Sequence, residues 1–116
     1  MLTVTLKHPP NEVRPNARVH WATKAKHVKM CRSSAFWSCK KAIQQNDGSV
    51  APKSYGITWF YFGQVPDVDN CLASCKAYID GCCDALHIND KQLECCYVSR
   101  MRDSDNRGLV EIAFFN

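Results

Sequence analysis

The sequence predicts one small domain of the α+β class, with strands and helices in the order β-α-β-α-β-β. Two kinds of pattern support this prediction: short segments rich in β-branched, aromatic or alternating apolar residues, and two longer stretches with apolar residues at helical spacing. The 116 residues are enough for one hydrophobic core, and 46% hydrophobic with 22% charged residues is ordinary for a globular domain. We therefore expect residues 1–116 to form a single domain with a mixed sheet and two helices.

In the first half of the chain, residues 2–7 alternate apolar and polar side chains, which predicts a strand. Prolines end it, and residues 8–20 read as a loop. A long helix is expected over 23–45, because Ala25, Val28, Ala35, Cys39, Ala42 and Ile43 fall on one side. The polar, glycine-containing segment 46–49 is expected to end it.

In the second half, residues 56–63 are β-branched and aromatic, which predicts a central strand. Residues 69–86 return to helical spacing, with an apolar stripe of Leu72, Cys75, Ile79, Cys82 and Leu86. Residues 92–100 and 109–115 read as the last two strands, joined as a hairpin by a polar turn.

Charge is distributed unevenly along the chain. Residues 1–66 carry ten Lys and Arg against two acids, whereas residues 67–116 carry five against nine, for a net charge of +4. A basic half beside an acidic half suits a protein that binds a phosphate backbone next to a metal site. Two solvated faces of opposite sign would produce the same distribution.

The eight cysteines do not form the spacings of a typical zinc site, since two pairs are adjacent and Cys71 and Cys75 are one helical turn apart. The first residues, Met1 to Lys7, lack the apolar run of a signal peptide, so we expect a cytoplasmic protein with reduced thiols and no membrane association. We interpret the cysteines as small buried hydrophobic residues.

Three carboxylates are the candidate metal ligands. Asp67 and Asp69 are two residues apart, so in an extended chain both would point to one face and could bind one Mg²⁺, or one ion each of a close pair. Asp90 follows the second predicted helix and would join them if that helix returns across the sheet. Lys76 lies seven residues after Asp69, where an ammonium could stabilise charge on a phosphate. The alternatives are a simple ion pair of Lys76 with Asp80, and helix capping by Asp67 or Asp69.

The segments Asp67-Val68-Asp69-Asn70, Lys76 to Gly81 and Ile88 to Leu93 together resemble the RusA family of Holliday junction resolvases. Arg14-Pro15-Asn16 and His20-Trp21 also resemble that family's loop after its first strand. Two departures are visible: Asn89 stands where the family commonly has an acid, and the gap between Asn70 and Lys76 is longer than in the enterobacterial type.

The resemblance implies a homodimeric endonuclease of phage type that uses Mg²⁺, with Mn²⁺ as a possible substitute, to nick opposed strands of four-way DNA junctions. It would leave 5′-phosphate and 3′-hydroxyl ends. By the same resemblance Asp67, Asp69 and Asp90 are the metal-binding acids, and Lys76 is the catalytic lysine.

Residues of the basic half are expected to bind the DNA, mostly through phosphates, which gives affinity without sequence information. Trp21 is expected to pack in the core, although contact of His20 and Trp21 with an unstacked base is an alternative. The expected DNA-binding residues are Arg14, Asn16, Arg18, His20, Lys24, Lys26 and Lys29.

Other classes of function remain open at this stage. The chain could be a non-catalytic DNA-binding protein of the same fold, or one selective for flaps or forks. It could also be an interaction protein stabilised by zinc on its cysteines.

Overall fold

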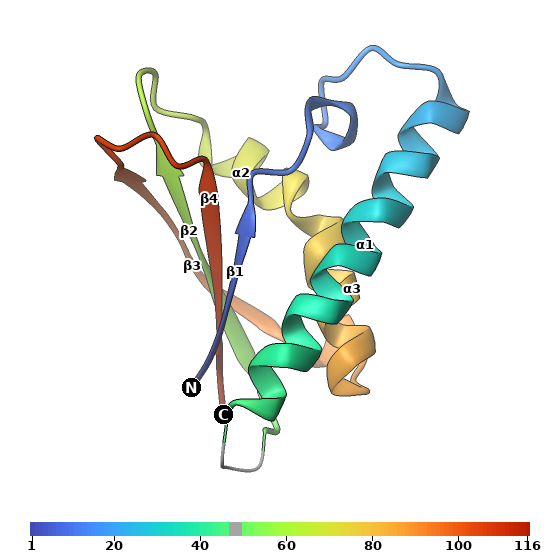
Figure 1. Cartoon of the computed structure of the whole chain (residues 1–116), viewed down its shortest axis with the longest axis vertical. Coiled ribbons are helices and arrows are strands. Elements are labelled where there is room, and N and C mark those ends of the chain that lie inside the picture. Colours follow the sequence, from blue (N-terminus) through green and yellow to red (C-terminus); the bar gives the residue numbers. More distant parts are fainter. Residues whose placement is uncertain (47–49) are drawn as a thin grey trace.

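The computed structural model describes residues 1–46 and 50–116, and it shows an α+β domain in which helices cover one face of a four-stranded sheet (Figure 1). This confirms the predicted class and the mixed sheet. The expected helix-ending turn falls largely on 47–49, outside the described residues. In chain order the elements are β1 (Leu2–Lys7), η1 (Asn11–Val13), α1 (Trp21–Gln44), β2 (Ser54–Tyr61), α2 (Val68–Ser74), α3 (Lys76–Leu86), η2 (Asp90–Gln92), β3 (Glu94–Arg102) and β4 (Leu109–Phe115).

The strand order in the sheet is β1-β4-β2-β3. Strand β4 runs antiparallel to both β1 and β2, whereas β3 runs parallel to β2 and forms an edge. The parallel pair is possible because α2 and α3 return the chain across the sheet between β2 and β3.

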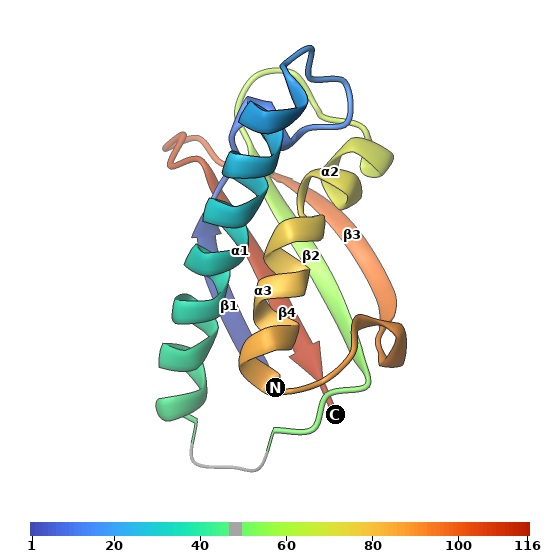
Figure 2. The same cartoon turned by 90° about the vertical axis from the view of Figure 1, so that its right-hand side faces the viewer.

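The core lies between the sheet and helices α1 and α3, which pack on the same face (Figure 2). Alternate residues of the strands point inwards, so the sheet contributes a set of fully buried side chains: Val4, Ile57, Val110, Ile112 and Phe114. The helices contribute small residues, among them Ala35, Cys39 and Cys82, each 0% exposed.

The predicted hairpin between the last two strands is wrong. Strand β4 crosses over to pair with β1 and β2, which leaves β3 outside β2. The cause is burial: the inward side chains of β4 are aliphatic or aromatic and fully buried, while β3 carries mainly exposed residues. Placing the more apolar strand β4 in the centre, and β3 with its charged residues Glu94, Arg100 and Arg102 at the edge, buries more apolar surface than the reverse order would.

The expected helix over 69–86 is divided into α2 and α3 at Cys75. The backbone of Cys75 lies at φ −91° and ψ 1°, and the Cys75 N–H donates hydrogen bonds to the carbonyls of both Cys71 and Leu72. This tight turn changes the helix direction, so Leu72 is 37% exposed although it lies on the predicted apolar stripe, whereas Ile79 is buried.

Helices α1 and α3 cross closely at Gly81. A Cβ at this position would overlap the backbone carbonyl of Arg32 and lie 3.0 Å from the Cβ of Ala35. The absence of a side chain at Gly81 therefore sets how close the two helices come.

Six of the eight cysteines are buried, as expected, but Cys95 and Cys96 are exposed on the edge strand β3. All eight are free thiols. Within the described residues, no helix is both long enough and apolar enough to cross a lipid bilayer.

Candidate functional site

Asp67 and Asp69 lie at the start of α2, where the chain leaves β2. Asp67 is the residue preceding the helix, in extended conformation, and Asp69 is in the first turn. Both side chains are exposed, and the Asp67 carboxylate makes no capping hydrogen bond. The predicted capping role is therefore not seen, and the carboxylate of Asp67 is not engaged by the helix end.

Asp90 lies near the start of strand β3, whereas Asp67 lies near the end of that strand. The carbonyl of Pro66, next to Asp67, accepts a hydrogen bond of 3.0 Å from Arg100 near the end of β3, whereas η2 with Asp90 immediately precedes Glu94 at its start. Six residues of strand separate Glu94 from Arg100, which is roughly 20 Å at ~3.3 Å per residue.

The structure therefore does not bring Asp90 to Asp67 and Asp69 within one chain. In residues 1–46 and 50–116 there is also no other group of three or more His, Cys, Asp and Glu side chains that could hold a metal ion. The metal-binding role of Asp67, Asp69 and Asp90 therefore stays a prediction from the family resemblance.

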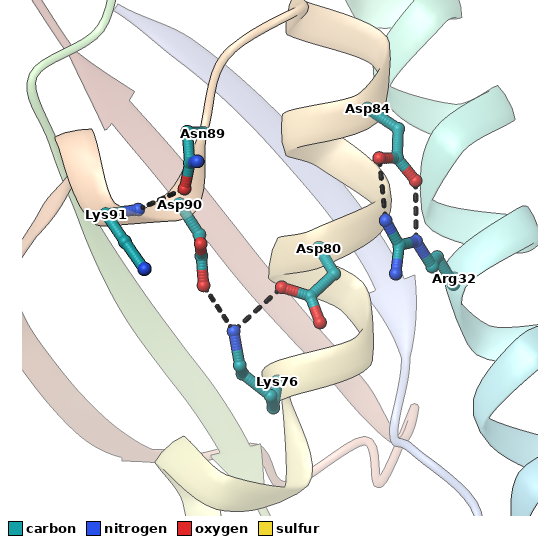
Figure 3. Close-up of polar contacts among 7 residues, drawn as sticks. All are labelled: Arg32, Lys76, Asp80, Asp84, Asn89, Asp90 and Lys91. Atoms are coloured by element: carbon teal, nitrogen blue, oxygen red, sulfur yellow. Dashed lines mark hydrogen bonds and ion pairs between the residues drawn. The ribbon is translucent and has the colours of Figure 1, made fainter.

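Asp90 instead meets the predicted catalytic lysine. The Nζ of Lys76 donates hydrogen bonds to Asp90 Oδ2 at 2.5 Å and to Asp80 Oδ1 at 2.8 Å, so three residues from α3 and η2 form one cluster (Figure 3). Hydrogen bonds to Asp80 and Asp90 raise the pKa of Lys76, and the hydrogen bond from Lys76 lowers the pKa of Asp90.

This cluster determines what Lys76 can do chemically. A lysine with a raised pKa stays protonated at neutral pH, so it suits stabilisation of negative charge rather than proton abstraction. An ammonium has three N–H donors, and the described residues occupy two of them. One donor remains for a ligand oxygen.

Asp80 is the residue that sequence reasoning missed as a member of the site. Its i,i+4 spacing from Lys76 was visible and was interpreted only as a surface pair. The family resemblance implies that Lys76 and Asp90 share a site, but no local pattern predicts their direct contact, because this contact depends on the path of the chain after α3.

Asn89, which departs from the family pattern, has a structural role. Its side chain accepts a hydrogen bond of 3.0 Å from the backbone N–H of Lys91, and its own N–H donates to the side chain of Gln92. This capping box fixes the turn that carries Asp90. Asn and Asp are comparable at such a position, so the substitution leaves the turn intact.

A polar cavity of about 370 Å³ opens beside the cluster, between α1, α3 and η2. Arg32 and Asp84 form one wall through a two-point ion pair, with Arg32 Nε 2.6 Å from Asp84 Oδ2 and Nη2 2.8 Å from Oδ1 (Figure 3). The other lining residues include Asp80, His87 and Asp90.

Two of the predicted DNA-binding cations lie beside predicted catalytic residues. Arg14 lines a small cavity with Asp67, and Lys24 lines a cavity of about 280 Å³ with Lys76 and Asp80. The loop before α1 and helix α2 lie at the same end of the molecule in both views (Figures 1 and 2). The basic half and the acidic half of the sequence therefore meet at this end.

The other predicted DNA-binding residues are exposed, and they do not all point the same way. Lys26 follows Lys24 by two residues, or about 200° around the helix, so it faces away from the Lys24 cavity. His20 caps the N-terminus of α1, and its Nδ1 accepts a hydrogen bond of 3.2 Å from the N–H of Ala22. The exposed members are Asn16, Arg18, His20, Lys26 and Lys29.

The expectation that Trp21 packs in the core is wrong. Its side chain is 76% exposed, and its ring lies 5.4 Å from the ring of His20. Trp21 is the first residue of α1, and it lies outside the buried core.

Comparison with known proteins identifies a relative without a described activity. The chain is 36% identical over 96 residues to an uncharacterized protein of Xylella fastidiosa, and the alignment covers 79% of this chain. The chain spans 62% of the length of that relative. No protein-family model matches the chain.

Proposed function

We propose that this protein is a structure-selective endonuclease that binds four-way DNA junctions as a homodimer and nicks opposed strands in the presence of Mg²⁺. The observation that supports this most is that Arg14 lines a cavity with Asp67, and Lys24 lines a cavity with Lys76. Cations that attract a phosphate backbone thus lie beside the groups that would act on it.

Lys76 is the residue best suited to act on the phosphate. Asp80 and Asp90 hold its ammonium in place and keep it charged, and its remaining donor would bind a non-bridging oxygen as negative charge builds up. Lys24, on the wall of the adjacent cavity, would hold a neighbouring phosphate.

The exposed aromatic pair at the start of α1 suits a branched substrate. His20 and Trp21 stand free of the core, and aromatic side chains of this kind stack on unpaired bases. A fork offers unpaired bases at its branch point, and an open four-way junction exposes the faces of its central base pairs, whereas a continuous duplex offers neither.

The Mg²⁺ dependence comes from the family resemblance and not from the site geometry. Because Asp67 and Asp69 lie apart from Asp90, the chain does not present the three acids as one ligand set. This separation favours a second candidate, a DNA-binding protein of the same fold without nuclease activity.

A cleavage assay tests the proposal and separates the two candidates. We expect the wild-type protein to nick a synthetic immobile four-way junction with Mg²⁺ and to leave a linear duplex of the same sequence intact. Lys76→Met should reduce the cleavage rate by about 10²-fold while junction binding survives, because one charge-stabilising donor is lost. Asp105→Asn, in the exposed turn before β4, is the matched control and should cleave normally.

The other outcomes are informative as well. Tight, selective junction binding without cleavage in Mg²⁺ or Mn²⁺ would support the non-catalytic candidate. Normal cleavage by both Asp67→Asn and Asp90→Asn would remove these acids from the site. Equal binding of junction and linear duplex would contradict structure selectivity.

A further inference from the structure

A small cavity next to Asp67 has the composition of a phosphate-binding pocket. Its volume is about 100 Å³, and its wall includes Arg14, Trp59, Asp67, Asn70 and Ser74. A space of this size holds about three water molecules at ~30 Å³ each, and a tetrahedral phosphate group is of comparable size.

Arg14 is unusual among the basic residues because part of its guanidinium is buried and unsatisfied. Its Nε is fully buried, and no described residue accepts a hydrogen bond from it. An unsatisfied buried donor is costly, so such an atom indicates a missing partner. The planar fork of an arginine matches two oxygens of a phosphate.

The position of Arg14 is fixed by an aromatic platform. Its guanidinium carbon lies 5.9 Å from the ring centre of Trp59, and that ring is also stacked on His8 at 4.5 Å. The side chain of Trp59 is only 5% exposed, and His8 is tied to the carbonyl of Phe60 at 2.7 Å. Arg14 is therefore held in advance of any ligand, which reduces the entropy lost on binding.

The charge around the cavity favours an anion. Arg100 approaches from the side of β3 and donates to the carbonyl of Pro66 next to Asp67. Arg14 in the cavity wall and Arg100 beside Pro66 thus place two positive charges near one carboxylate.

We propose that this cavity is a phosphodiester subsite, in which Arg14 binds non-bridging phosphate oxygens of the DNA and Asn70 and Ser74 complete the pocket. The inference builds on the proposed function and makes it more specific: it assigns one phosphate of the substrate to the side of Asp67. Arg14 becomes a residue with a defined partner, unlike the exposed Arg18, which contributes only general attraction.

The test uses the fluorescence of Trp59, which touches Arg14. The chain has three tryptophans, and Trp21 and Trp37 are 76% and 67% exposed, so Trp21→Phe and Trp37→Phe together leave Trp59 as the only indole. The 5′-phosphorylated dinucleotide pTpT is titrated into this background, and inorganic phosphate is titrated separately. We expect a saturable change with pTpT and much weaker binding of inorganic phosphate.

Variants of the cavity residues then test which side chains bind the phosphate. Arg14→Gln should weaken pTpT binding about tenfold or more, because a charge-assisted hydrogen bond is lost. Arg14→Lys should be intermediate, since it keeps the charge but loses the fork. The control Lys41→Gln, in the last turn of α1, should stay within about twofold of the parent protein. Ser74→Ala removes one buried oxygen with little change in packing, and it should also weaken pTpT binding. This variant keeps the test available if Arg14→Gln does not fold.

The failures of the two proposals can be told apart. Unchanged pTpT affinity in Arg14→Gln, or in both Arg14→Lys and Ser74→Ala, would overturn the subsite even if the protein binds junctions. Equal affinity for inorganic phosphate and pTpT would overturn its assignment to DNA. If pTpT binding depends on Arg14 but the protein does not bind junction DNA, the phosphate subsite is supported and the proposed function is contradicted.

Discussion

Two aspartates, Asp84 and Asp90, owe their lowered pKa values mainly to a hydrogen bond from one cation each. Arg32 lowers the pKa of Asp84, and Lys76 lowers that of Asp90. The two pairs differ in what they connect. Arg32 and Asp84 join α1 to α3, so this pair holds the helical layer together, whereas Lys76 and Asp90 fix the groups of the candidate site.

The Arg32–Asp84 pair predicts a pH-dependent contribution to stability. The pKa of Asp84 is depressed below its ordinary value of 3.8, so the contribution is present above that value and is lost as pH falls through the lower, folded pKa. Asp84→Asn should reduce the free energy of unfolding by about 0.5 kcal/mol at pH 7, as for other exposed ion pairs. At pH 2 the difference between the variant and the wild type should be smaller than at pH 7, because the Asp84 carboxylate is then protonated in a larger fraction of folded molecules.

Urea unfolding at the two pH values measures this effect. Asp105→Asn, for which no such pair is seen among the described residues, serves as the control and should be neutral at both. A deficit of Asp84→Asn that is as large at pH 2 as at pH 7 would show that the carboxylate charge is not the cause.

At the scale of elements, the contact between α1 and α3 determines the thickness of the helical layer. The residues at the crossing are small: Ala35 and Cys39 from α1 meet Gly81 and Cys82 from α3, and the Sγ of Cys39 lies 3.8 Å from the carbonyl oxygen of Cys82. Small residues let the helix backbones approach closely. The high cysteine content is thus explained in part by packing.

Gly81→Ala tests this close approach. Alanine is favoured over glycine in a helix by about 1 kcal/mol, so an uncrowded site would gain stability. Here the added methyl group meets the Arg32 carbonyl, and overpacking of this kind costs about 1–3 kcal/mol. We expect a net loss in the free energy of unfolding, measured by urea denaturation.

Ser33→Ala is the matched control, because Ser33 is exposed on α1 next to the crossing. It should be slightly stabilising, by about 0.5 kcal/mol, for reasons of helix propensity alone. A gain in stability for Gly81→Ala as well would mean that the two helices can move apart without penalty.

At the scale of the whole molecule, the loop and helix ends that carry Arg14, Lys24 and Asp67 lie at one end. The loop before α1, the start of α1 and helix α2 lie together there (Figure 2), and Lys24 shares a cavity with Lys76. The far end of α1 carries Lys41 in its last turn, about 26 Å along the helix axis at ~1.5 Å per residue. If DNA binds at the first end, these two lysines should differ in their effect.

Salt-dependent binding measures this difference. Lys24→Ala should weaken junction binding and lower the slope of log affinity against log salt by about one, since one phosphate contact is lost. Lys41→Ala removes the same charge from the same helix and should leave the slope unchanged. Equal slopes for the two variants would place the DNA elsewhere on the surface.

The sequence by itself determined the α+β class, the first strand from Leu2 to Lys7, and the approximate extent of the long helix α1. These features follow from local periodicity, because a residue's position along a strand or helix already fixes which face it occupies. The closeness of Lys76 and Asp80 could be predicted for the same reason, since four residues make about one helical turn.

Only the tertiary structure decided which distant residues meet. It placed β4 in the centre of the sheet, divided the second helix at Cys75, exposed Trp21, and directed Asp90 to Lys76 instead of to Asp67 and Asp69. Such contacts join segments far apart in the chain, and they are selected by the total apolar surface that the whole fold can bury. No local pattern in the sequence gives that total buried apolar surface, because it depends on all segments at once.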